Sequence, residues 1–112
     1  MASKYDIKID QGASLYLKLT WKNPDRSIVD TTGYTGKMQI RTKVNGEVVL
    51  ELNSSTNEII ISNDGVIELV LTSIQTMEIL TNGVYDLIVT SPLASVKRLM
   101  QGNILLSKAV TV

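Results

Sequence analysis

The strongest constraint on the fold is an alternation of apolar and polar residues with a period of two. It is clearest over residues 15–21, which read Leu-Tyr-Leu-Lys-Leu-Thr-Trp, and it recurs over residues 5–10, which read Tyr-Asp-Ile-Lys-Ile-Asp. Successive side chains of a β-strand point to opposite faces, so this pattern predicts strands with one buried and one exposed face. A chain made of such segments folds as packed β-sheets.

Turn-forming residues separate the alternating segments and predict hairpins. Asn45-Gly46 lies between two alternating runs, and this dipeptide favours a type I′ turn, in which both central residues have positive φ. Asn63-Asp64-Gly65 and Ser91-Pro92 mark two further turns. We predict hairpins over residues 37–52, 59–72 and 84–101.

The end of the chain is predicted to be less regular. Gly102-Asn103 is expected to form a β-bulge, because glycine inside a strand pattern often marks one. Residues 104–112 then form one broken strand or two short ones.

One short helical segment is predicted near residues 73–80. Thr72 and Gln75 have the spacing of a capping box, and Asn82-Gly83 ends the segment after one or two turns. A parallel α/β fold needs long helices between its strands, and the sequence contains none.

We therefore predict one all-β domain over residues 1–112, an antiparallel immunoglobulin-like β-sandwich of seven to nine short strands. Tyr85 begins a predicted strand, as a conserved tyrosine does in immunoglobulin domains, and Leu87 stands where those domains carry a cysteine.

The chain contains neither histidine nor cysteine. Ser–His and Cys–His nucleophiles are therefore excluded, as are disulfides, and a zinc site lacks its usual ligands. Gly33-Tyr34-Thr35-Gly36 is not followed by a helix and does not complete the motif of a phosphate-binding loop. We predict a protein that is not an enzyme and that has no catalytic residues and no cofactor.

The acidic residues do not form a metal-binding motif. Asn23, Asp25 and Asp30 flank one loop and would offer at most a weak Ca²⁺ site, but their spacing matches no calcium loop. We interpret them as turn residues and predict no metal.

The charge pattern argues against nucleic acid and membrane as partners. Eleven basic and eleven acidic side chains give a net charge of zero, and Lys97-Arg98 is the longest basic stretch. Nucleic-acid binding needs a basic surface, and a membrane span needs about 20 apolar residues. Zero net charge also favours self-association.

Five segments resemble a group of small structural proteins from the virions of tailed bacteriophages. They are residues 7–13, 17–21, 29–41, 83–87 and 96–102. The shared features are an acidic-Gln-Gly opening, a central Asp-x-Thr-Gly-Tyr-x-x-x-Met-Gln-Ile-Arg motif and a Tyr-Asp-Leu strand. The layout is similar to the N-terminal β-sandwich domain of baseplate upper proteins, which attaches receptor-binding proteins to the tail.

The resemblance implies a virion structural protein that is made in the host cytoplasm. We expect a tail or baseplate adaptor that mounts fibres or receptor-binding proteins, binds other virion proteins and forms a homo-oligomer. One alternative is a decoration (cement) protein of the capsid head. Another is a carbohydrate-binding module that uses Trp21 and the exposed tyrosines, although Trp21 at the end of an apolar run is more typical of a core or rim residue.

Docking is expected at the edges of the sandwich, because unpaired backbone groups of an edge strand can bind a further strand. The first strand (residues 5–10) and the last (residues 109–112) contain no proline. We predict that these seams contain Tyr5, Ile7, Ile9, Val110 and Val112.

Overall fold

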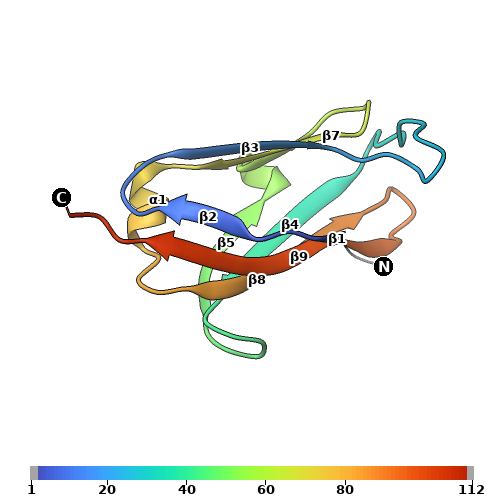
Figure 1. Ribbon diagram of the computed structural model, residues 1–112. Coiled ribbons are helices and arrows are strands. Elements are labelled where there is room, and N and C mark those ends of the chain that lie inside the picture. Colours follow the sequence, from blue (N-terminus) through green and yellow to red (C-terminus); the bar gives the residue numbers. More distant parts are fainter. Residues whose placement is uncertain (1–2, 111–112) are drawn as a thin grey trace.

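A computed structural model describes residues 3–110 and shows two β-sheets packed face to face (Figure 1). The larger sheet has six strands: β1 (Ser3–Lys4), β2 (Ile7–Asp10), β4 (Thr35–Arg41), β5 (Val48–Asn53), β8 (Gly83–Thr90) and β9 (Val96–Ser107). The smaller sheet has three: β3 (Leu15–Thr20), β6 (Ile59–Ile61) and β7 (Val66–Leu71). The all-β sandwich predicted from the sequence is confirmed.

The order of the strands identifies the type of sandwich. The larger sheet runs β1-β9-β8-β4-β5, with β2 also paired to β9, and the smaller sheet runs β3-β7-β6. Variable-type immunoglobulin domains also divide nine strands between two sheets, although their first strand belongs to the smaller one. The predicted immunoglobulin-like architecture is therefore present, and the chain has nine described strands, at the upper end of the predicted number.

One pairing departs from the expected antiparallel arrangement. Both β1 and β2 run parallel to β9, with Ser3 opposite Met100 and Ile7 opposite Ile104. All the other strand pairs are antiparallel. Hairpin rules describe only strands that follow each other in the sequence, so they do not reach this contact between the two ends of the chain.

The predicted bulge at Gly102-Asn103 is wrong. These residues pair in regular register with Tyr85 and Val84, and the register shift lies instead where Leu99 is inserted, since Met100 pairs with Leu87 and Arg98 with Ile88. Glycine is needed at position 102 because the chain crosses it closely: a Cβ atom there would lie 2.1 Å from the carbonyl oxygen of Tyr5.

The three predicted hairpins form, as β4–β5, β6–β7 and β8–β9. The turn type predicted for the first is wrong, because only Asn45 has positive φ, and the turn is closed by the Gly46 amide donating to the Lys43 carbonyl. The register shift at the start of β5 moves the turn by one residue, so that its central residues are Val44 and Asn45 rather than Asn45 and Gly46.

The predicted helical turn is α1 (Ser73–Met77), and its capping box is complete. The Gln75 amide donates to the Thr72 hydroxyl oxygen, and the Thr72 amide donates to the Gln75 side chain. None of the helices in residues 3–110 is long and apolar enough to cross a membrane.

The core between the sheets is almost entirely aliphatic. Its fully buried side chains come from both sheets and from the second residue after α1. The largest of them are Ile9, Met38, Ile40, Leu52, Ile59, Ile67, Leu69, Leu71, Ile79, Leu87, Val89 and Ile104. Thr31 and Thr76 are the buried polar residues, and both hydroxyls are hydrogen-bonded. Packing of aliphatic side chains therefore holds the layers together.

Tyr85 ties the N-terminal strands to the sheet. Its hydroxyl donates to the Tyr5 carbonyl oxygen at 2.6 Å, between β1 and β2. Burial raises the pKa of the Tyr85 hydroxyl well above its usual range, with smaller contributions from Tyr5 and Asp6. The hydroxyl is therefore a fixed donor at every physiological pH.

Replacing Tyr85 with phenylalanine should lower the free energy of unfolding by about 1–2 kcal/mol, because the Tyr5 carbonyl loses its partner. Urea titration measures the change. Tyr34→Phe is the matched control, since the hydroxyl of Tyr34 makes no hydrogen bond to another described residue. Equal effects of the two substitutions would contradict the role given to the Tyr85 hydroxyl.

Candidate interaction surfaces

The five predicted docking residues do not form one surface. Ile7 and Ile9 are buried in the core, whereas Tyr5 is about half exposed between β1 and β2. Val110 is 98% exposed beyond the end of β9. Val112 lies outside the described residues.

The predicted last strand, residues 109–112, does not provide an edge among the described residues. β9 ends at Ser107, Ala109 and Val110 follow it outside any strand, and residues 111 and 112 lie beyond the described part of the chain. β9 is bordered by β1 and β2 on one side and by β8 on the other, so its backbone groups are used on both sides. Only β1 and β2 lie at the edge, and the side chains of Ile7 and Ile9 point inward. A partner at this edge would meet the backbone and the exposed side chains of Lys8 and Asp10, not the two isoleucines.

A continuous polar surface covers the outer side of the larger sheet, and we call it the network face. One row of aligned residues crosses five strands, from β5 to β1: Glu51, Gln39, Asp86, Gln101 and Lys4. Lys37, Arg41, Asn53 and Arg98 flank this row on the same strands. The alternation that buries the other side of these strands places all nine polar side chains outward.

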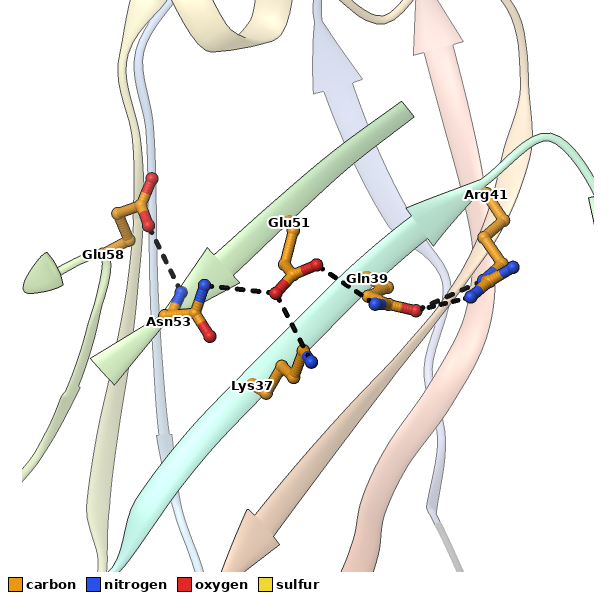
Figure 2. A network of polar contacts seen from close by, with 6 residues as sticks. All are labelled: Lys37, Gln39, Arg41, Glu51, Asn53 and Glu58. Atoms are coloured by element: carbon orange, nitrogen blue, oxygen red, sulfur yellow. Dashed lines mark hydrogen bonds and ion pairs between the residues drawn. The ribbon is translucent and has the colours of Figure 1, made fainter. Parts of the chain in front are cut away.

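Glu51 is the centre of the first cluster on this face (Figure 2). Its carboxylate accepts from Gln39 Nε2 at 3.1 Å and from Asn53 Nδ2 at 3.3 Å, and it lies 3.5 Å from Lys37 Nζ. The hydrogen bond from Gln39 and then that from Asn53, with Lys37 nearby, hold the pKa of the Glu51 carboxyl below its usual value. Glu51 is therefore ionised and fixed by three strand residues.

Arg41 extends the cluster toward the β4–β5 loop (Figure 2). Its Nη2 donates to Gln39 Oε1 at 2.8 Å, and its Nη1 donates to the Gly46 carbonyl at 2.9 Å. The second bond holds the side chain of Arg41 against the loop. The guanidinium is consequently fixed in place.

A second cluster lies on β8 and β9. Arg98 Nε is 3.4 Å from Asp86 Oδ2, and Arg98 Nη1 donates to Gln101 Oε1 at 3.3 Å. Surface ion pairs of this kind contribute little to stability, but they fix the direction in which a charged side chain points.

A hollow of about 550 Å³ lies between the two clusters. It is bounded by the β4–β5 loop at one side and by β9 at the other, and polar and apolar surface contribute equally to its lining, which comprises Lys4, Gln39, Arg41, Val44, Asn45, Val84, Tyr85, Asp86, Arg98, Gln101, Gly102 and Asn103. The network face therefore combines fixed charges with space for side chains of a partner.

An aromatic pair, Trp21 and Tyr34, lies outside the network face and beside Lys97 of β9. The Trp21 and Tyr34 rings meet edge to face with centroids 5.8 Å apart, and Lys97 Nζ lies 5.2 Å from the centre of the Trp21 ring. Trp21 is partly buried against the core. The indole therefore makes contacts with Lys97 and Tyr34, and it also lines a hollow of about 670 Å³ beside them.

The loop carboxylates are used within their own turns. Asp25 Oδ1 accepts from the amide and hydroxyl of Ser27, and Asp30 Oδ1 accepts from the amide and hydroxyl of Thr32. These hydrogen bonds lower the pKa of both carboxyls. The interpretation of these residues as turn formers agrees with this geometry.

The network face was not predicted as a unit from the sequence. The outward positions of β4 and β5 can be read from their alternation, but the contact between Gln39 and Glu51 depends on the register of the hairpin. The available signal was the density of amide and charged residues at alternate positions of residues 37–41 and 51–53.

The chain matches no family model and no curated protein. Among solved structures it is similar to a chain of the "Crystal structure of ICOS in complex with ICOS-L and an anti ICOS-L VNAR domain", with 14% sequence identity and a TM-score of 0.48. The alignment covers 96% of this chain and 56% of the other, so this chain spans about half the length of the one it matches. The likeness says nothing about what this chain binds.

Proposed function

We propose that this chain is a non-enzymatic structural module of a phage virion, which mounts fibres or receptor-binding proteins on the tail and contacts its partner through the network face. The sequence resemblance to baseplate proteins supports the tail assignment. The observation that carries the binding role is the set of polar side chains fixed around the 550 Å³ hollow.

Fixed side chains favour binding because a partner does not have to order them. Immobilising a long side chain on association costs about 0.5–1.5 kcal/mol. Arg41 and Arg98 are already held by hydrogen bonds within the chain, and both line the hollow. The rigid sheet beneath them keeps their spacing constant.

The charges on the network face indicate the chemistry of the partner. Lys4, Lys37, Arg41 and Arg98 are basic, whereas Glu51 and Asp86 are the acidic members and are each paired with a basic side chain. Arg41 contacts an amide and a carbonyl but no carboxylate of residues 3–110. The proposed partner is a protein surface that presents a carboxylate to Arg41.

The geometry around Trp21 argues against the carbohydrate-binding alternative. A sugar stacks on an open aromatic face, but Lys97 lies over the Trp21 ring and Tyr34 packs against it. We therefore do not propose a glycan site at Trp21.

Electron microscopy of purified virions tests the proposed location. With a small protein tag on this chain, we expect extra density at the tail tip or baseplate. Density spread over the head would support the capsid decoration alternative and contradict the tail proposal. A chain absent from washed particles would contradict a virion role altogether.

Charge reversal at Arg41 tests the role of the network face. Arg41→Glu should reduce incorporation of the chain into virions at least thirtyfold, a loss of about 2 kcal/mol, because it places a carboxylate against the partner's carboxylate. Quantitative mass spectrometry of particles measures the number of copies.

Lys108→Glu is the matched control, since it makes the same change of charge at an exposed position outside the network face. The folded state of each variant is checked by circular dichroism. Equal incorporation of folded Arg41→Glu and Lys108→Glu chains would contradict a contact through this face.

A further inference from the structure

The smaller sheet has one long edge with no partner. β3 pairs with β7 on one side, and no other described strand pairs with its second side (Figure 1). Among residues 3–110, the backbone groups of Leu15–Thr20 make hydrogen bonds only with β7. Alternate N–H and C=O groups along this strand therefore remain available for another strand.

The apolar side chains of β3 are also incompletely buried. Leu15, Leu17 and Leu19 point into the sandwich but stay only partly buried. The residues directly opposite them on β7, Leu71, Leu69 and Ile67, are fully buried. The three leucines thus lie under an open edge, and a strand added beside β3 would bury them further.

The other edges of the sandwich are better protected. β2 has four residues and exposes Lys8 and Asp10, and β6 has three residues. On β5, the amide and carbonyl of Asn53 are already bonded to Glu58. Edge strands that are charged, short or already hydrogen-bonded resist pairing with another strand. β3 is six residues long, carries one charge and contains no proline, so it is the most open to pairing.

We propose that β3 pairs antiparallel with β3 of a second copy of this chain about a twofold axis, joining the two smaller sheets into one six-stranded sheet. Three strands from each copy make up that sheet. Zero net charge places no general repulsion between the copies.

The sequence of β3 selects the register of this pairing. With Leu17 opposite Leu17 of the second copy, Leu15 and Leu19 face each other on the inner side, and Tyr16 faces Lys18 on the outer side. An aromatic ring opposite a basic side chain is a favourable cross-strand pair. The strand is therefore complementary to itself.

The neighbouring registers are less favourable. A shift in one direction places Lys18 opposite Lys18, and like charges directly opposite each other repel. A shift in the other direction brings Ala13, which lies in the loop before β3, into the ladder.

This pairing concerns the smaller sheet and so goes beyond the proposed function, which uses the larger one. A twofold axis perpendicular to the joined sheet leaves both network faces free and pointing in the same direction. Two such faces on one dimer would bind a symmetric or repeated partner more tightly than one face alone.

Disulfide trapping tests both the pairing and its register, because the chain has no cysteine of its own. Tyr16→Cys and Lys18→Cys change two exposed side chains. Directly opposite residues come within the Cα distance that a disulfide needs. We expect a mixture of the two variants to form disulfide-linked dimers at least tenfold faster than either variant alone.

Equal rates in the mixture and in the separate variants would overturn the register. The absence of linked dimers in all three samples, under conditions where free thiols are consumed, would overturn the pairing itself. Failure of the tail assignment would leave this result unchanged, because the experiment uses only the purified chain.

A charge substitution provides an independent readout in solution. Tyr16→Lys places a lysine opposite Lys18 of the second copy, on each side of the central Leu17 pair. It should raise the dimer dissociation constant at least tenfold, as measured by analytical ultracentrifugation. Ile60→Lys, on the opposite edge strand of the same sheet, adds the same charge and should leave the constant unchanged. A monomeric parent chain at every concentration, or equal effects of both variants, would contradict the proposal.

Discussion

Replacing Gly102 with alanine is expected to lower the free energy of unfolding by about 3 kcal/mol. The new Cβ atom would lie 2.1 Å from the Tyr5 carbonyl oxygen and 2.7 Å from its carbon, so the backbone between β1 and β2 must move away. Three hydrogen bonds anchor that segment: Tyr5 N to Gln101 O, Tyr85 Oη to Tyr5 O, and Asn103 N to Asp6 Oδ1. At about 1 kcal/mol each, their loss accounts for the expected change.

Urea or thermal unfolding followed by circular dichroism measures the effect of Gly102→Ala. Asn103→Ala is the control, because Asn103 is exposed on the same strand and its amide keeps its bond to Asp6. If Gly102→Ala were as stable as the control, the close crossing of Tyr5 over β9 would be incorrect.

Leu87→Ala is expected to destabilise the fold by about 2–5 kcal/mol, the range for deleting a buried leucine side chain. Leu87 is 0% exposed on β8, and its strand neighbours Met38 and Met100 are also buried. It occupies the position where immunoglobulin domains place a disulfide cysteine. Since this chain has no cysteine, packing at that position must supply the stability.

Leu93→Ala makes the same chemical change at a position that is 93% exposed, and it should alter stability by less than about 0.5 kcal/mol. Denaturant titration of both variants measures the contrast. A loss below 1 kcal/mol for Leu87→Ala would mean that the core is not centred on β8.

Local signals in the sequence located most of the strands and α1, but residues 104–107 continue β9 instead of starting a separate strand. Alternation fixed which side of each strand is buried, and the spacing of Thr72 and Gln75 identified the capping box that the structure contains. The Asn45-Gly46 signal located the first hairpin but gave the wrong turn type, because the bulge at the start of β5 changes the loop geometry.

Long-range contacts could not be predicted in this way. The parallel pairing of β1 and β2 with β9 joins residues almost a whole chain apart, and no local pattern specifies its register. The bulge predicted at Gly102 was wrong for the same reason. The position needs glycine because the backbone of Tyr5, which is distant in the sequence, passes close to it.

Some features of the candidate site could be predicted from the sequence, and others could not. The alternation that made Ile7 and Ile9 candidates for an edge also marks them as core residues, and the structure buries both. The partly covered leucines of β3 look like ordinary core positions in the sequence, since only the order of strands shows that no strand lies beside them.

Lysine labelling of intact virions tests the central claim, that the chain binds its partner through the network face. Lys4 and Lys37 lie on that face, and Lys108 lies outside it. After brief acetylation, mass spectrometry should show Lys4 and Lys37 at least fivefold less modified in virions than in the free chain, with Lys108 modified equally in both. Equal modification of Lys4 and Lys37 in the two samples would contradict the claim.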